Sequence, residues 1–226
     1  MINGKSVLGI TLARGGSKRV PRKNIINING KPLIQYTIDE AKKSKYIDHY
    51  IVSTDDEEIE NFCLSHGTTV YHRERAEDTQ TSADAILEVL EGIKDVSGTP
   101  DYIVEIMCTN PLKTFEDIDG VIERIDETKS DTVCSVVRVW DYHPSRVKFI
   151  EGNKMKDVYP EVLESRRQDL TPPAYIRNGS IYAMTLNQIK VNGSRYDKNT
   201  VPYIMPEERT INIDEPIDLE LARLLT

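Results

Sequence analysis

Apolar and polar residues alternate in blocks along the chain, and the blocks predict alternating strands and helices. Nearly continuous apolar runs, as expected for strands covered on both faces, occur at residues 6–13 (SVLGITLA), 101–107 (DYIVEIM) and 132–139 (TVCSVVRV). Shorter strands are predicted at residues 48–53 and 68–71. Apolar residues at helical spacing predict helices at residues 33–45, 57–65, 82–94 and 117–128. This βαβ alternation predicts an α/β fold with a mostly parallel sheet.

The alternation stops after Trp140. Residues 141–177 are rich in proline, tyrosine and charge and have no clean period, which favours an arm, a lid or an inserted subdomain. The pattern returns with predicted strands at residues 180–185 and 210–213 and a final helix at 217–225. We therefore expect one domain spanning residues 1–226, with residues 141–177 forming an arm.

Composition and charge narrow the classes of function. The 226 residues are 38% apolar and 29% charged, a globular profile with enough chain for one substantial core. The net charge of −8 argues against a general nucleic-acid or membrane binder. Residues 1–38 nevertheless contain no acid and seven cations: Lys5, Arg14, Lys18, Arg19, Arg22, Lys23 and Lys31. A cationic pole on an acidic protein indicates binding to an anion.

Cysteine, histidine and hydropathy patterns indicate no disulfide framework, no zinc site and no membrane span. Three cysteines, at 63, 108 and 134, form no CxxC pair, and the four histidines have no metal-binding spacing. No apolar run approaches the roughly 18 residues that a membrane span needs, and no signal-peptide pattern is present. We therefore expect a reduced, cytoplasmic protein.

The cations concentrate in one glycine-containing loop. Residues 13–24 read ARGGSKRVPRKN and follow the first predicted strand, where open α/β sheets bind ligands. Gly15 and Gly16 allow close backbone approach to an anion, and five cations lie within ten residues. Because GxxxxGK[ST] and GxGxxG are both absent, the two better-known phosphate loops do not fit. A polyphosphate site is favoured over the alternative, a solvated basic turn.

The same loop carries a family resemblance. ARGGSKRVPRKN followed by NINGKPLIQYTI resembles the N-terminal signature of the acylneuraminate cytidylyltransferases. Further similar segments follow in order: IVSTDDEEI, AEDTQTSADAILEVL, TNPL, RRQDLTPPAYIRNGSIYAM and INIDEPIDLELA. The resemblance spans nearly the whole chain. It implies a Rossmann-like sheet of the nucleotide-diphospho-sugar transferase type, with residues 141–177 as a dimerisation arm.

The resemblance also implies an activity. Members of the family transfer CMP from CTP to the anomeric hydroxyl of a nonulosonic acid (sialic, legionaminic or pseudaminic acid), release pyrophosphate, use Mg²⁺ and act as homodimers. CTP and a sugar acid are therefore the expected partners, with no nucleic acid. Two alternatives stay open: a nucleotidyltransferase for another sugar, such as an octulosonate or a sugar phosphate, and a non-catalytic nucleotide-binding module.

On the nucleotide side, the resemblance implies roles residue by residue. Arg14, Ser17 and Lys18 would hold the triphosphate beside Gly15 and Gly16, and Lys23 would neutralise charge developing at the α-phosphorus. Arg14 and Lys23 are thus the expected catalytic residues. Further nucleotide contacts are implied for Asn24 at the cytosine ring, Arg73 or alternatively Arg75 at the base, Ser82 and Thr109. Ser82 or its neighbour Thr81 is equally well explained as the cap of a helix.

This chain departs from the family at two places, one that concerns contacts with the base and one that concerns the metal. The residues before Thr109 are Met107 and Cys108 instead of Gln and Pro, and a buried thiol is the better interpretation of Cys108. The family's first metal-binding aspartate is Asn212 here, so Asp214 with Asn212 is the expected Mg²⁺ site. Asp218 is expected to serve the start of the last helix.

The implied sugar contacts come from two motifs: Arg167, Gln168, Asn178 and Tyr182. An arginine suits the carboxylate of an α-keto acid. The alternative interpretation is that Asn178-Gly179 forms a turn and that Tyr182 packs in the core.

Overall fold

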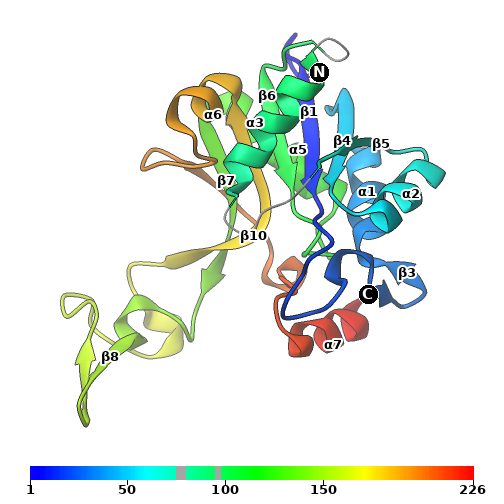
Figure 1. The fold of residues 1–226 in the computed structure, drawn as a ribbon. Coiled ribbons are helices and arrows are strands. Elements are labelled where there is room, and N and C mark those ends of the chain that lie inside the picture. The colour runs from blue at the N-terminus through cyan, green and yellow to red at the C-terminus, as the bar shows by residue number, and fades with distance from the viewer. Residues whose placement is uncertain (75–79, 95–97) are drawn as a thin grey trace.

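The computed structural model describes residues 1–74, 80–94 and 98–226 and has a seven-stranded sheet at its centre (Figure 1). In spatial order the strands are β11 (Val201–Ile204), β7 (Thr132–Val139), β10 (Ala174–Thr185), β6 (Tyr102–Ile106), β1 (Val7–Leu12), β4 (His49–Thr54) and β5 (Thr69–His72). β10 pairs antiparallel with β6 and with β7, and the other neighbouring pairs are parallel. The predicted mostly parallel α/β sheet is confirmed.

Helices cover both faces of this sheet. Their bounds are α1 (Leu33–Lys43), α2 (Glu57–Ser65), α3 (Ser82–Gly92), α5 (Phe115–Thr128), α6 (Leu186–Asn192) and α7 (Pro216–Leu225). α3 and α6 pack on one face, while α1, α2 and α5 pack on the other. Several of them begin where the sequence supplies a cap: the Asp56 carboxylate accepts from the backbone N–H groups of Glu58 and Ile59 at the start of α2. Asp218 accepts from Glu215 N at the start of α7, as predicted.

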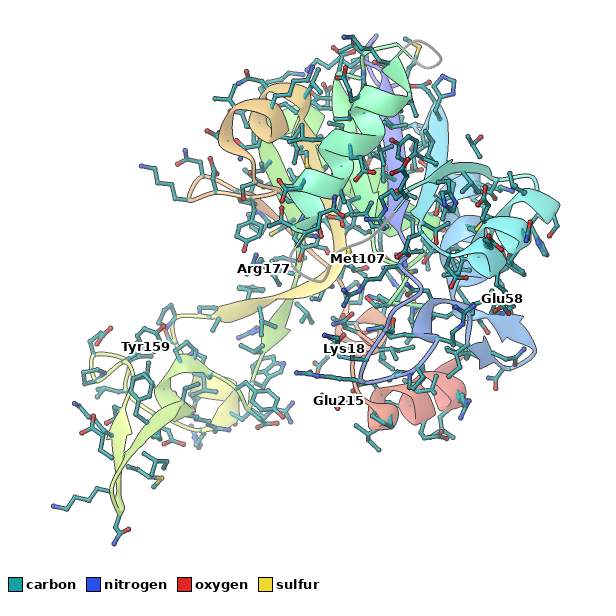
Figure 2. All side chains as sticks on the ribbon, viewed as in Figure 1. Lys18, Glu58, Met107, Tyr159, Arg177 and Glu215 are labelled. Carbon is teal, nitrogen blue, oxygen red and sulfur yellow. The ribbon has the colours of Figure 1, made fainter. Side chains whose placement is uncertain are left out.

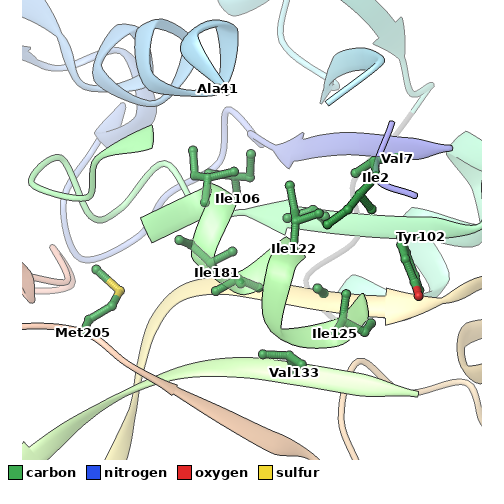
Figure 3. Packing of buried hydrophobic residues seen from close by; sticks show 14 residues of the cluster. Ile2, Val7, Ala41, Tyr102, Ile106, Ile122, Ile125, Val133, Ile181 and Met205 are labelled. Carbon is green, nitrogen blue, oxygen red and sulfur yellow. The ribbon is translucent and has the colours of Figure 1, made fainter. Parts of the chain in front are cut away.

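Strand β6 shows why the central strands are apolar at nearly every position. Its residues Tyr102, Val104 and Ile106 join the core under α5, together with Ile122 and Ile125 of that helix (Figure 3). The alternate residue Ile103 packs on the opposite face, under α3. Because both faces are covered, neither can be polar without a partner, which accounts for the unbroken apolar runs.

The last part of the sheet differs from the sequence prediction. Residues 210–213 form no strand: Ile213 N donates to Thr109 O, and Ile211 and Ile213 pack against α7 instead. The seventh strand is β11, which pairs in parallel with β7 at the sheet edge. Pro202 within β11 hides it from a pattern search, since proline is tolerated in a strand only at an edge or a bulge. β10 also begins at Ala174, six residues before its predicted start.

Residues 141–177 project from the body as an arm (Figure 1). Its base is a two-stranded extension of the sheet, in which residues 174–177 pair with residues 136–139. Beyond it lie η2 (Pro144–Arg146), the hairpin of β8 (Lys148–Glu151) and β9 (Lys154–Asp157), and η3 (Arg167–Asp169). Exposed apolar side chains gather on this arm: Tyr142, Phe149, Ile150, Met155, Tyr159 and Leu163.

Small elements complete the other end of the molecule. η1 (Lys23–Ile25) follows the basic loop, β2 (Asn27–Ile28) pairs with β3 (Lys31–Pro32), and η4 (Glu207–Arg209) precedes residues 210–213. Ile28 and Leu33 pack against Leu219 and Ala222 of α7. Within the described ranges, no helix combines the length and apolar character needed to cross a membrane.

Candidate nucleotide and sugar site

A cavity of about 490 Å³ lies at the carboxyl ends of β1 and β6. This is where an open α/β sheet is expected to bind its ligand. The cavity brings together nine residues that the sequence predicted for the site: Arg14, Ser17, Lys18, Lys23, Asn24, Arg73, Ser82, Thr109 and Asp214. Figure 2 shows Lys18 on the basic loop, on the same side as Glu215, which caps the start of α7.

The cavity wall is strongly cationic in an otherwise acidic protein. Among the described residues that line it, five are cations, Arg14, Lys18, Arg19, Lys23 and Arg73, against two acids, Glu105 and Asp214. Four of these cations belong to the basic loop, and the remaining cation of that loop, Arg22, does not line the cavity. Its guanidinium pairs with Asp56 and Glu58 at the start of α2, which anchors the loop. The wall therefore suits a ligand with several negative charges.

Gly15 has a structural role that the sequence did not predict. Gly15 and Gly16 do not line the cavity, and the Gly15 N–H donates to Asp55 Oδ1 at 3.0 Å. A Cβ on Gly15 would lie 2.3 Å from Asp56 Oδ2. Gly15 is thus required by the close approach of the loop to the start of α2, while anion binding by this N–H is not supported by the contacts.

Lys23 and Asn24 join the basic loop to two other segments. Lys23 Nζ donates to Ile213 O at 2.7 Å and to Asp214 Oδ1 at 2.9 Å. Asn24 is buried: its Nδ2 donates to Arg14 O, and its Oδ1 accepts from Cys108 Sγ. Asn24 therefore fixes the loop against the end of β6, and contact with the base stays a prediction. Cys108 is the buried thiol that the sequence favoured, and burial raises its pKa to about 11.

Arg73 follows β5 and lies buried in the cavity wall. Its backbone N–H donates to Thr54 O, and its side-chain Nη1 donates to Gln80 Oε1 at 3.1 Å. Its Nε is buried and donates to no group in the part of the chain that the structure describes. An unmatched buried donor is costly, which favours a ligand acceptor at this position. The alternative candidate, Arg75, lies outside the described residues.

The start of α3 places both Thr81 and Ser82 at the cavity. Thr81 is the N-cap and forms a capping box with Asp84. The Thr81 side chain accepts from Asp84 N, and the Asp84 carboxylate accepts from Thr81 N. Ser82 is the first helical residue and faces the cavity. Thr109 also faces the cavity, with its carbonyl held by Ile213 N at 2.8 Å.

None of the four residues predicted for the sugar lines this cavity. Arg167 and Gln168 lie on the arm, in η3, and the Arg167 guanidinium is 5.7 Å from the Trp140 ring centroid. The Asn178 side chain is buried, and both of its polar atoms have partners: Oδ1 accepts from Ser135 Oγ, and Nδ2 donates to Met205 Sδ. Tyr182 is buried in the core under α3, as its alternative interpretation held. The alternative that Asn178-Gly179 forms a turn is wrong: both residues lie within β10, where the register with β7 shifts at a bulge and Gly179 has a positive φ (+64°).

The predicted metal residues lie together at the cavity rim. The Asn212 amide donates to Asp214 Oδ2 at 2.6 Å, and only Asp214 lines the cavity. Within the described residues, His, Cys, Asp and Glu form no cluster of three or more that could bind a metal. One carboxylate with one amide is the small donor set that Mg²⁺ accepts when substrate phosphates complete its shell. These residues therefore fit a Mg²⁺ ion that is also coordinated by the phosphates of a bound nucleoside triphosphate.

The sequence search missed two buried ionisable residues here, Glu105 and Lys113. Glu105 was visible as an acid flanked by apolar residues in the run 101–107; Lys113 gave no signal. Lys113 Nζ donates to Met107 O and Thr37 Oγ1, both at 2.7 Å, and to Asn110 O at 2.5 Å. It therefore clamps the turn that presents Thr109.

Burial lowers the pKa of Lys113 to about 7, and this gives a testable pH dependence. Between pH 7 and 10 the unfolded lysine binds a proton that the folded one has released, so the free energy of unfolding rises with pH. Relative to Lys113→Met, the native protein should gain up to about 1.4 kcal/mol per pH unit above pH 7. Urea unfolding of both proteins at pH 6 to 9 measures the difference; a constant difference would contradict the lowered pKa.

Comparison with known proteins agrees with this geometry. Residues 8–225 match the family model described as Cytidylyltransferase. A pseudaminic acid cytidylyltransferase of Campylobacter jejuni is 30% identical over 222 residues, covering 96% of this chain and 95% of that protein. A CMP-N,N'-diacetyllegionaminic acid synthase of Legionella pneumophila is 32% identical over 225 residues, covering 97% and 95%. The solved structure of a CMP:2-keto-3-deoxy-manno-octonic acid synthetase complexed with CTP shares the fold, with a TM-score of 0.72 at 18% identity and coverage of 97% and 98%.

Proposed function

We propose, since this chain belongs to the cytidylyltransferase family, that it transfers CMP from CTP to a nonulosonic acid and releases pyrophosphate. Relatives that match nearly end to end are named for pseudaminic and N,N'-diacetyllegionaminic acids, which supports this acceptor class. The observation that carries the proposal is the cavity at the carboxyl end of β1, to whose wall the described part of the chain contributes five cations.

The reaction needs positioning and charge neutralisation more than covalent chemistry. The anomeric hydroxyl oxygen of the sugar acid attacks the α-phosphorus of CTP and its proton passes to solvent. The bond between the α-phosphorus and the oxygen that bridges to the β-phosphate breaks, and pyrophosphate leaves with that oxygen. Negative charge then develops on the transferred group and on the pyrophosphate. Arg14 and Lys18 would hold the triphosphate, and Lys23 would stabilise the charge at the α-phosphate. The supporting observation is that all three line one cavity.

Mg²⁺ dependence is part of the proposal. Asp214 would hold the ion, with Asn212 contributing its amide oxygen or a bound water, and the ion would neutralise phosphate charge. The exposed position of Asp214 at the rim, beside Lys23, supports this assignment.

Replacing Asn212 by aspartate tests the metal assignment. The substitution adds a second carboxylate two residues from Asp214, so we expect pyrophosphate release to reach half of its maximal rate at a lower Mg²⁺ concentration, by about threefold to tenfold. A Mg²⁺ titration of native and Asn212→Asp protein at saturating CTP provides the measurement. Asn192→Asp, on α6 outside the cavity, is the control. Abolished activity in Asn212→Asp would show that the amide is required as it stands.

We also propose that the protein is a homodimer joined through the arm and that it works in the cytoplasm. Exposed apolar side chains on an arm that projects from the body support the first part, since such surfaces mark interaction sites. Three cysteines that are all buried free thiols support a reducing compartment. Size-exclusion chromatography with light scattering measures the molar mass of the protein in solution and tests the dimer. The mass should be about twice the 25.7 kDa of one chain.

Thermal shift with four nucleotides tests the cytidine assignment. CTP with Mg²⁺ should raise Tm more than ATP, GTP or UTP, because binding to the native state adds RT ln(1 + [L]/Kd) to its stability. Equal shifts would remove the assignment. Pyrophosphate release with CTP and a panel of nonulosonic acids and an octulosonate then separates an enzyme from a nucleotide-binding module.

A further inference from the structure

Glu105 lies at the middle of the sheet with its carboxyl group fully buried. It belongs to β6, where its neighbour across the antiparallel pairing is Tyr182 of β10. Its side chain is on the α3 face, as is that of Ile103, and it lines the cavity together with Met107. A carboxylate with 0% exposure in such a position is expensive and calls for a specific reason.

Arg195 supplies the countercharge from the segment that follows α6. Its Nη1 donates to Glu105 Oε2 at 2.6 Å, and its guanidinium lies 4.4 Å from the ring centroid of Tyr182. Arg195 does not itself line the cavity. It therefore holds the carboxyl group from behind while Glu105 borders the open space.

The second carboxyl oxygen is left unmatched. Glu105 Oε1 is buried and accepts no hydrogen bond within the described part of the chain. Burial raises the pKa of Glu105, whereas Arg195 and, to a smaller extent, the nearby Ser82 hydroxyl oppose that rise. Ser82 lies near the carboxyl group but makes no hydrogen bond to Oε1. A buried acceptor that borders a cavity and lacks a donor is matched by a ligand that brings one.

Strand order indicates which substrate meets Glu105. Across the sheet, β5, β4, β1, β6 and β10 follow one another. Arg73, with its unmatched Nε, comes from the end of β5, and the basic loop comes from the end of β1. If the base lies toward β5 and the triphosphate over β1, the side of β6 and β10 remains for the acceptor sugar. This step rests on the proposed function.

We propose that Glu105 is a specificity-determining residue that accepts a hydrogen bond from an N–H or O–H substituent of the sugar acid. Arg195 is its positioning residue. The site thus takes a nonulosonic acid with a donor group, an acylamino or hydroxyl, at the substituent that faces β6, and discriminates against an acid lacking it.

The test compares sugar acids rather than overall activity. The probes are the nonulosonic acid that the native enzyme uses best and its analogues in which one acylamino or hydroxyl group at a time is replaced by hydrogen. For one analogue, kcat/KM of the native enzyme should fall about 10- to 100-fold, as expected for a lost hydrogen bond to a charged group. The measured quantity is the ratio of kcat/KM for the parent acid to kcat/KM for that analogue. In the double variant Glu105→Leu/Arg195→Met this ratio should fall to within about twofold of one, while the affinity for CTP stays within about twofold of the native value.

Each other outcome identifies what failed. A double variant that loses activity on parent and analogues alike, with the ratio kept, overturns the inference, because a merely structural role has that effect. Weakened CTP binding with unchanged sugar selectivity would assign Glu105 to the base and overturn it as well. If the double variant fails to fold, Glu105→Gln, which retains the size of the side chain, must reduce the ratio at least about threefold for the inference to stand. A native enzyme inactive with CTP and every acid in the panel overturns the proposed function and this inference together, whereas an active enzyme with an unchanged ratio overturns only the inference.

Discussion

Lys23→Ala is expected to lower kcat by about 100- to 1000-fold without unfolding the protein. The Lys23 ammonium is the cation that lies between the basic loop and Asp214, where it donates to Ile213 O and Asp214 Oδ1. In the proposed reaction, charge builds at the α-phosphate, and a positioned cation stabilises it in the transition state more than in the ground state. The loss should therefore fall on kcat more than on the affinity for CTP.

Steady-state pyrophosphate release and CTP binding by calorimetry, measured on the same preparations, separate these effects. Lys31→Ala is the matched control: Lys31 lies in β3, is paired with Asp39 and does not line the cavity. Its kcat should stay within about twofold of the native value. A kcat of Lys23→Ala near the native value would refute the catalytic role.

Arg195→Met is expected to cost about 3–5 kcal/mol of stability at pH 8, because it leaves the fully buried Glu105 carboxylate without its countercharge. The double variant Glu105→Leu/Arg195→Met removes both charges and should recover most of that loss. Arg223→Met, which breaks an exposed pair with Glu220 on α7, serves as the control and should cost less than about 1 kcal/mol.

The loss in Arg195→Met should also depend on pH in a defined direction. Burial already raises the pKa of Glu105, and removing the guanidinium raises it further. Above the ordinary value of 4.5, the folded carboxyl then keeps a proton that the unfolded chain has released, so stability falls as pH rises. Urea unfolding at pH 5 and pH 8 measures this, and the deficit should be smaller at pH 5. An equal deficit at both values would mean that Glu105 is not left charged and buried.

The basic loop shows which contacts the sequence can predict and which it cannot. Residues 13–24 predicted an anion site at the end of the first strand, and four of the loop's five cations line the cavity found there. The fifth, Arg22, turns to Asp56 and Glu58, which lie more than thirty residues away in the chain. A local pattern gives no information about such a partner, because the pairing depends on how α2 packs beside the loop.

The sugar side shows the opposite case. Motif similarity selected Arg167, Gln168, Asn178 and Tyr182, none of which borders this cavity. The structure instead brings Glu105 to the cavity wall with Arg195 behind it, 90 residues apart in sequence. A charge inside an apolar strand marks a position worth examining, but its partner appears only when the segment after α6 folds over β10.

Taken by itself, the sequence determined the alternation of strands and helices, the parallel character of the sheet, and the place of the loop whose cations line the cavity. It does so because burial on both faces, helix periodicity and capping are local requirements that each segment must satisfy in its own residues. Only the tertiary structure decided that Gly15 is required by Asp56, that residues 210–213 pack without forming a strand, and that a buried carboxylate borders the cavity. Those features arise from contacts between segments distant in the chain, whose free energies depend on packing that no local pattern encodes.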